Sequence, residues 1–320
     1  MNEFSVIKKY FSNLSKNNRG SFDLSDDIFF DYKKKVGISI DSYVEGTHFL
    51  NFKNPNLVIK KALRGAISDL ICKGIIPKYY FMSCSGNKKH LTQANLAKIK
   101  LALKQEQKKY NIFLAGGDTS YSNRLSITVS VVGYSKKSPV LRSGAKVNDD
   151  IYITNTIGDA FVGSKLLKGK IKLSKKNSDY FVRRFYLPIL PIKFSKRIHL
   201  FANSAIDISD GFFQDLQHIL SRSNLSSKIF KNKIPISSYL NSYLIRTKKN
   251  KLNFISNGDD YQILYTASKK MRYLIKKISK STSTKVSIVG IVKNKSISNN
   301  TKSTEEKFKF PKKLGYIHNF

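Results

Sequence analysis

Acidic residues are scarce in this 320-residue chain, and where they stand is the clearest sign of chemistry. The sequence has 58 Lys and Arg but only 21 Asp and Glu. Ten of the acidic residues fall in short segments rich in Gly, Ser or Thr, namely Asp26, Asp27, Asp41, Glu45, Asp69, Asp118, Asp207, Asp210, Asp259 and Asp260. In so basic a chain, we expect carboxylates placed in this way to build a site.

The positions of these carboxylates suggest a metal site. Asp41, Asp69 and Asp118 lie at or close to the ends of predicted core elements, and Asp26 and Asp27 are adjacent. Carboxylates that share one site cannot all stay ionised without compensating cations. Oxygen ligands suit hard ions, and Mg²⁺ is typically held by a few carboxylates and by substrate phosphates. The pattern therefore indicates several Mg²⁺ ions and phosphoryl transfer, which needs positioning and charge neutralisation.

The common nucleotide-binding motifs are missing. The chain lacks G-x-x-x-x-G-K-[ST], G-x-G-x-x-G and the kinase catalytic-loop signatures, so any ATP must bind at another kind of phosphate site. Each residue also has an ordinary structural interpretation. Asp207 or Asp210 could be a helix N-cap, the Gly116–Thr119 segment a plain turn, and His48 a core or surface histidine.

The predicted elements alternate between strands and helices, which indicates α/β architecture. In the first half we predict strands at 36–40, 79–84, 112–115 and 125–133, and helices at 55–73 and 91–109. The first strand ends at Asp41, the loop after it carries Glu45 and His48, and Asp69 lies near the end of the first helix.

A polar stretch at 135–138, followed by Pro139, marks a domain boundary, and we predict domains at 1–137 and 138–320. The second half reads as strands at 150–154, 261–266 and 286–291 and helices at 159–167 and 268–279, with a Lys- and Ser-rich loop after 167. A turn at 206–211 opens another helix that ends near 220, and a polar loop is expected at 294–307.

Composition excludes several classes of protein. With 41% hydrophobic residues the chain can bury a core, yet no stretch is long and apolar enough for a membrane helix, so we expect a cytoplasmic protein without membrane contact. Cys72 and Cys84 are too few for a disulfide framework. The net charge of +37 comes mainly from scattered Lys, whereas specific nucleic-acid recognition relies on Arg, so a nucleic-acid partner is not expected.

Read in order, the segments resemble the thiamine-monophosphate kinase family over nearly the whole chain. The resemblance rests on the Asp26-Asp27 pair and on these motifs: IDSYVEGTHF (40–49), KALRGAISDLICKGIIP (61–77), LAGGDTS (114–120), LRSGAKVNDDIYIT (141–154), AIDISDGFFQDLQHI (205–219), NGDDYQILYT (257–266) and the closing Gly315-Tyr316. It implies a two-domain fold like aminoimidazole ribonucleotide synthetase: an N-terminal α/β domain whose four-stranded sheet pairs across a homodimer, and a C-terminal α+β domain. ATP and thiamine phosphate would bind between the domains.

The resemblance also implies roles for individual residues. Its metal-binding positions correspond to Asp27, Ser39, Ile40, Asp41, Asp69, Asp118, Asp207 and Asp210. Its ATP-binding positions correspond to Gly117, Asp118, Arg142 and Ser209, and its substrate-binding positions to His48, Asp259 and Tyr316. The implied reaction is direct in-line transfer of the γ-phosphoryl group of ATP, without a catalytic acid or base, because the acceptor phosphate is already an anion.

Some positions depart from the family pattern. Ser25 stands where Gly usually precedes the paired aspartates, Ile40 replaces a common Thr, and Asp259 stands where Glu is usual. Lys313 occupies the place of an expected aromatic residue.

Three alternatives remain open from the sequence. Two are other enzymes of the same superfamily, a selenophosphate synthetase, which should carry a reactive N-terminal Cys, or aminoimidazole ribonucleotide synthetase. The third is a basic binding protein that kept the fold and lost catalysis.

Overall fold

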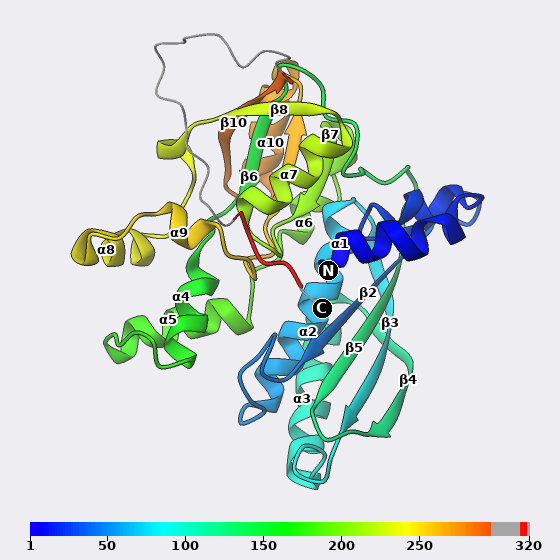
Figure 1. The fold of residues 1–320 in the computed structure, drawn as a ribbon, viewed down its shortest axis with the longest axis vertical. Coiled ribbons are helices and arrows are strands. Elements are labelled where there is room, and N and C mark those ends of the chain that lie inside the picture. Colours follow the sequence, from blue (N-terminus) through cyan, green and yellow to red (C-terminus); the bar gives the residue numbers. More distant parts are fainter. Residues whose placement is uncertain (296–313, 319–320) are drawn as a thin grey trace.

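The computed structural model describes residues 1–295 and 314–318. It contains two five-stranded sheets with α2 (Pro55–Cys72) running between them (Figure 1). Most of the polar segment expected at 294–307 lies outside the described residues. Within those residues no helix has the length and apolar character needed to cross a membrane.

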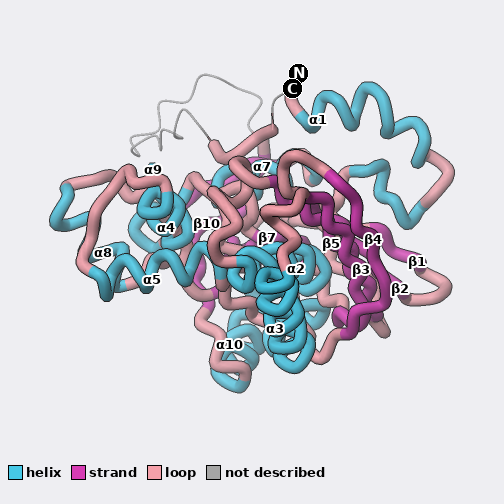
Figure 2. The backbone as a smooth tube through the Cα atoms, turned by 90° about the horizontal axis from the view of Figure 1, so that it is seen from below, coloured by secondary structure: helices cyan, strands magenta, loops and turns pink. Residues whose placement is uncertain are grey.

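The first sheet is formed by the N-terminal half of the chain. Its strands are β1 (Phe29–Asp31), β2 (Val36–Val44), β3 (Ile76–Gly86), β4 (Phe113–Tyr121) and β5 (Ser126–Tyr134). They lie in the order β1-β2-β5-β3-β4, with only the β3/β4 pair parallel. Helices α2 and α3 (Gln93–Tyr110) pack on the same side of this sheet (Figure 2).

Helix α2 is buried along nearly its whole length. Pro55 stands in its first turn, where the missing N–H costs nothing, and Gly74 just beyond its end takes a φ of +79°. The helix is apolar on most sides because it packs against the first sheet and also against β7 (Ala202–Asp207), α5 (Lys175–Tyr186) and α6 (Ile192–Ser195) of the second half. It therefore carries polar side chains such as Asp69 into the interior between the two halves.

The second sheet consists of β6 (Asp150–Thr154), β7 (Ala202–Asp207), β8 (Leu225–Ile229), β9 (Ile263–Ala267) and β10 (Val286–Asn294), in the order β7-β9-β6-β10-β8 and antiparallel throughout. Side chains alternate between its faces. Ile151 and Ile153 pack with α7 (Phe212–Arg222), whereas Tyr152 packs with α10 (Arg272–Ser281) on the other face. The sheet is thus covered on both sides.

The remaining helices extend these two units. Helices α4 (Asp159–Leu167), α5 (Lys175–Tyr186), α8 (Ser238–Thr247) and α9 (Leu252–Ile255) share a smaller core, and α6 (Ile192–Ser195) joins the core beneath α10. The chain opens with α1 (Glu3–Val6) and short helical turns up to Leu24. Helix α5 replaces part of the expected Lys- and Ser-rich loop, because Phe181 and Phe185 give this basic segment one apolar face.

The mixed α/β architecture is confirmed, with corrections at the site. Strand β2 continues past Asp41 to Val44, and β4 includes the whole Gly116–Thr119 segment, which is therefore not a plain turn. The first sheet has five strands because the short β1 joins the four long ones. The domain boundary at 137/138 and the dimer remain predictions.

Candidate active site

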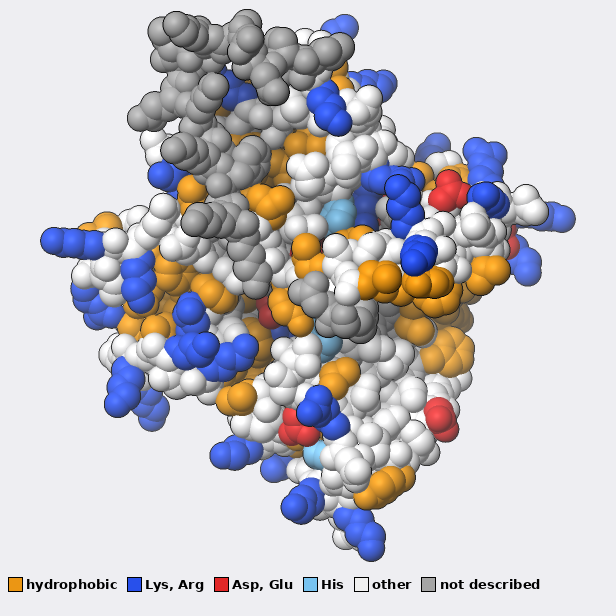
Figure 3. All heavy atoms as spheres, in the orientation of Figure 1, with side chains coloured by type: hydrophobic (Ala, Val, Ile, Leu, Met, Phe, Trp, Pro, Cys, Tyr) orange, Lys and Arg blue, Asp and Glu red, His pale blue; other side chains and the backbone are white. Residues whose placement is uncertain are grey.

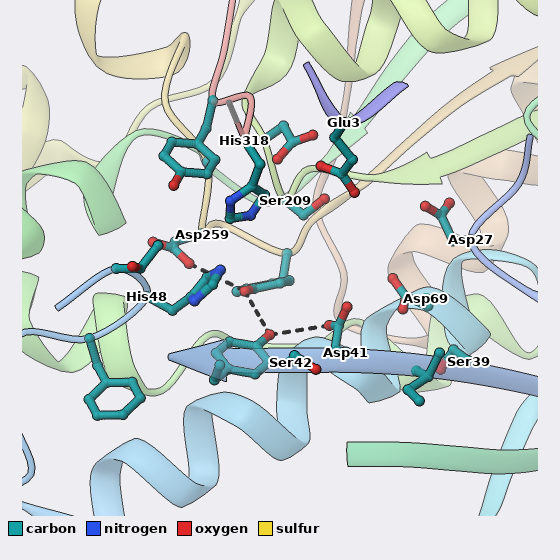
Figure 4. A pocket seen from close by; sticks show the side chains of 18 of the residues that line it. Glu3, Asp27, Ser39, Asp41, Ser42, His48, Asp69, Ser209, Asp259 and His318 are labelled. Atoms are coloured by element: carbon teal, nitrogen blue, oxygen red, sulfur yellow. Dashed lines mark hydrogen bonds between the residues drawn. The ribbon is translucent and has the colours of Figure 1, made fainter. Parts of the chain in front are cut away.

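A cavity of about 870 Å³ lies between the two halves of the molecule. Its walls include β2, the 45–50 loop, the β7–α7 loop, the segment before β9 and both ends of the described chain. The predicted site residues that line it are Asp27, Ser39, Ile40, Asp41, His48, Asp69, Arg142, Ser209, Asp210, Asp259 and Tyr316. Carboxylates gather at one end, and His48, Asp259 and His318 lie at the other (Figure 4).

The carboxylate end is formed by Asp27, Asp41 and Asp69, with Asp207 buried behind them. Burial, together with the nearby charges of Asp41 and Asp207, raises the pKa of Asp69 well above its usual range. Burial and, to a lesser extent, Asp27 raise the pKa of Asp207 to about 7, and that of Asp41 to about 6. The chain thus concentrates more negative charge here than its own side chains neutralise.

Asp207 has the donor atoms that a metal site needs. Both of its carboxylate oxygens are buried and neither accepts a hydrogen bond of normal geometry, although the neighbouring Ser68 hydroxyl acts to lower the pKa of Asp207. It does not cap α7, and neither does Asp210: the helix has no side-chain cap, and Asp215 Oδ2 accepts a 3.0 Å bond from the Gly211 amide. Because buried polar atoms are normally satisfied, these orphaned oxygens fit a hard divalent cation.

Ser39 and Ile40 take different positions on β2. The Ser39 hydroxyl points inward and donates to the Ala66 carbonyl of α2 at 2.8 Å. Ile40 points outward, and the residue is 66% exposed. The carbonyl oxygen of Ile40 can still bind a metal ion, so the change from the common Thr to Ile does not remove a metal ligand.

Two cations reach into the carboxylate end. Arg142 pairs with both oxygens of Asp27, with a 3.0 Å bond from Nε to Oδ2 and a second, shorter bond from its Nη2 to Oδ1. The ammonium of Lys73 lies 2.8 Å from Asp26 Oδ1 and 3.3 Å from Asp27 Oδ2. Burial would raise the pKa of Asp27, but Arg142 and Lys73 outweigh it and hold the value at about 2.

The other end of the cavity is built around His48 and Asp259. His48 Nδ1 accepts a 2.9 Å bond from the Val44 amide, which leaves Nε2–H as a donor. Burial and His318 lower the pKa of His48 to about 4, so the ring is neutral at neutral pH. Asp259 pairs at 2.7 Å with the buried ammonium of Lys61 and takes a left-handed φ of +69°. Strained backbone of this kind is concentrated at functional sites.

Two tyrosines connect the ends of the cavity. The Tyr43 hydroxyl lies 3.3 Å from Asp41 Oδ2 and 3.0 Å from the Tyr261 hydroxyl, which lies 3.2 Å from Asp259 Oδ1 (Figure 4). Two hydroxyl protons cannot fill all three contacts while both carboxylates are ionised. The protonation of one carboxylate therefore affects the hydrogen bonding of the other.

The loops that carry Ser209 and Asp259 are in direct backbone contact. The Asp259 amide donates to the Ser209 carbonyl at 2.9 Å, and a Cβ on Gly258 would lie only 1.5 Å from that carbonyl oxygen. The Tyr316 amide donates to the Asp210 carbonyl at 3.0 Å, which places Tyr316 beside the same loop. Burial and Glu3 raise the pKa of Asp210 to about 7.

Gly117 and Asp118 do not join this cluster within one chain. Asp118 pairs with Ser83 across β3/β4 and lies in the same row as Thr128 and Ser42. This row faces away from Asp41, because neighbouring residues of a strand point to opposite faces. Three strand spacings separate β4 from β2, which is about 14 Å. Asp118 is exposed on the open face of the sheet.

Some residues at the site were not singled out from the sequence. Lys61 and Lys73 are fully buried, and Glu3 and Tyr43 line the cavity. A sign was available for the two lysines: each interrupts an otherwise apolar helical pattern at 55–73. Nothing in the local pattern distinguishes Glu3 or Tyr43, which reach the cavity through the folding of distant segments.

Residues 25–135 match the family described as AIR synthase related protein, N-terminal domain, and this match agrees with the AIR synthase-like fold of the chain. Thiamine-monophosphate kinase from Buchnera aphidicola of Acyrthosiphon pisum is 34% identical over 99% of this chain and 98% of its own length. The enzyme of the same name from Haemophilus influenzae is 31% identical over 83% of this chain and 81% of its own. The chain belongs to the thiamine-monophosphate kinase family.

Solved structures agree with this assignment. A structure described as AaThiL complexed with AMPPCP and TMP has a TM-score of 0.81 and 27% identity, over 92% of this chain and 91% of its own. The thiamine monophosphate kinase of Aquifex aeolicus has a TM-score of 0.78 and 27% identity, over 91% and 93%.

Proposed function

We propose that this protein catalyses ATP-dependent phosphorylation of thiamine phosphate to thiamine diphosphate. The observation that carries the proposal is the cavity with carboxylates at one end and His48 and Asp259 at the other. A solved relative is described as complexed with AMPPCP and TMP, an ATP analogue and, in this family, thiamine monophosphate. One cavity that takes both polyanions needs cations at the point where they meet.

Mg²⁺ is the proposed source of that positive charge. Asp27, Asp41, Asp69 and Asp207 would hold the ions, with Ser39, the Ile40 carbonyl and Asp210 beside them. When bound, the metal neutralises phosphate charge, as is general in phosphoryl transfer. The orphaned oxygens of Asp207 and the all-oxygen donor set support this assignment.

The chain's own residues supply positioning. Arg142 presents a planar fork that suits a phosphate as well as it suits Asp27, and its movement to ATP would release both Asp27 oxygens. Ser209, on the loop after β7, would contact the same nucleotide. No general base is required, because a phosphate monoester loses its second proton near pH 6. A phosphate oxygen of thiamine phosphate then attacks the γ-phosphorus of ATP in line, and ADP leaves. The protein contributes orientation and charge neutralisation.

His48, Asp259 and Tyr316 are proposed to bind thiamine phosphate. The neutral imidazole of His48 offers an Nε2–H donor, and Asp259 offers a carboxylate to the positively charged thiazolium ring. Lys61 holds Asp259 in place from the buried side. The shorter Asp at position 259, in place of the usual Glu, is compatible with this role because its backbone is fixed against Ser209.

We further propose that residues 1–137 form an N-terminal domain and residues 138–320 a C-terminal domain. Two chains would pair through the open face of the first sheet, which belongs to the N-terminal domain. The open face carries exposed apolar side chains, including Ile40, Tyr79, Phe81 and Phe113. Pairing there would cover them and would bring Gly117 and Asp118 of one chain towards the cavity of the other.

Lys and Arg are spread over many elements of the face seen in Figure 3 rather than gathered in one stripe.

The deciding experiment measures thiamine diphosphate formed by purified protein from thiamine phosphate, ATP and Mg²⁺. EDTA and free thiamine are the controls. Product that requires both Mg²⁺ and the monophosphate would support the proposal. Folded protein that forms no product would favour another activity of the superfamily or a non-catalytic role.

A further inference from the structure

Lys73 lies beside the carboxylate end of the cavity. It stands at the C-terminal cap of α2 and its side chain is fully buried. Its ammonium makes three contacts, to Asp26 Oδ1 at 2.8 Å, Asp27 Oδ2 at 3.3 Å and the Ala205 carbonyl at 2.8 Å. A cation buried to this extent is retained only when its partners compensate for lost hydration.

The surroundings of Lys73 are those of a bound metal ion: two carboxylates and one carbonyl, all oxygens, converge on it. Asp26 is also held by two backbone donors, since Oδ1 also accepts the Asp27 amide at 2.9 Å and Oδ2 accepts the Arg142 amide at 2.8 Å.

We propose that the ammonium of Lys73 acts as a built-in substitute for a divalent cation between Asp26 and Asp27. It holds the Asp26-Asp27 segment in position whether or not Mg²⁺ is bound, and it lowers by one the number of ions that the carboxylate end takes up. The proposal rests on the proposed use of divalent ions at this end of the cavity. Lys73 is a positioning residue: it touches the metal-binding carboxylates and neither substrate.

The test uses Mg²⁺ alone, without ATP or thiamine phosphate, so its outcome does not depend on turnover. Lys73→Met removes the charge, and Lys73→Gln keeps a polar group of similar length in case the Met variant does not fold. Calorimetric titration counts bound ions, and thermal unfolding compares melting temperatures in EDTA and in millimolar Mg²⁺. We expect one more ion per chain in the variant, and a larger rise in melting temperature with Mg²⁺ than in the wild type.

Arg64→Met is the matched control. Arg64 lies on the same helix and is buried, and it pairs with the single carboxylate of Glu106, at 2.8 Å, away from the cavity. This variant should lose stability while keeping the wild-type ion count and the wild-type response to Mg²⁺. If the Lys73 variants behave in the same way as Arg64→Met, the lysine is only a structural ion pair and the inference is overturned.

Discussion

The most discriminating prediction concerns the buried carboxylate of Asp207. Replacing it with Asn keeps the shape of the side chain and removes its charge. Asp207 is 1% exposed, and burial together with Asp27 raises its pKa from an ordinary 3.8 to about 7. The unfolded chain therefore gives up this proton at lower pH than the folded protein does, and folding stability falls as pH rises through that window.

The rise in pKa sets the size of the effect. A difference between 3.8 and about 7 corresponds to about 4 kcal/mol at a pH above both values. Near pH 4 the wild-type carboxyl is protonated in the folded state, so Asp207→Asn and wild type should have similar stability in EDTA. Near pH 8 the variant should be more stable, by up to about 4 kcal/mol, because the wild type must then bury a charge.

The assay is urea unfolding in EDTA and in millimolar Mg²⁺ at both pH values. Mg²⁺ should stabilise the wild type near pH 8 and should stabilise Asp207→Asn much less, since the variant lacks one of the carboxylates proposed to bind the metal. Asp179→Asn, the same chemical change at an exposed residue of α5, is the control and should change little. Equal stability of Asp207→Asn and wild type near pH 8, or equal stabilisation by Mg²⁺, would refute the reasoning.

Three further predictions concern catalysis. Asp118→Asn should lose metal-dependent turnover and keep the wild-type circular dichroism spectrum; near-normal activity would contradict its assignment. Mixing Asp118→Asn chains with Asp207→Asn chains, after exchange of subunits, should restore about a quarter of the activity if each site uses Asp118 of the other chain. No recovery in verified mixed dimers would place Asp118 in its own chain's site. Asp259→Ala should raise the KM for thiamine phosphate more than the KM for ATP, whereas an unchanged KM for thiamine phosphate would remove Asp259 from substrate binding.

The parts of the site that local patterns describe were predictable from the sequence. Helix α2 and Asp69 near its end follow from apolar spacing and from the Gly74 stop signal. The sequence pattern does not predict that β2 extends beyond Asp41, because a polar residue after an apolar run is typical of a strand end, whereas Asp41 faces a cavity rather than solvent.

Other features depend on contacts between distant segments. Lys73 meets Asp26 only after the chain has folded, and α2 must lie between two sheets before a lysine there becomes buried. For Asp118 the LAGGDTS motif is recognisable in the sequence, but the strand order places β4, which carries Asp118, away from Asp41 on β2. Strand order follows from pairings far apart in sequence, which the period of a single segment does not encode.

The contact between Gly258 and the Ser209 carbonyl has a consequence for how this enzyme can evolve. A side chain at position 258 would collide with that carbonyl oxygen at 1.5 Å and force the two loops apart. The Ser209 loop, proposed to contact ATP, and the Asp259 loop, proposed to bind thiamine phosphate, therefore keep a fixed spacing. A change in acceptor specificity must therefore come from side chains such as those of His48 or Asp259, because the spacing between the two backbone loops is fixed.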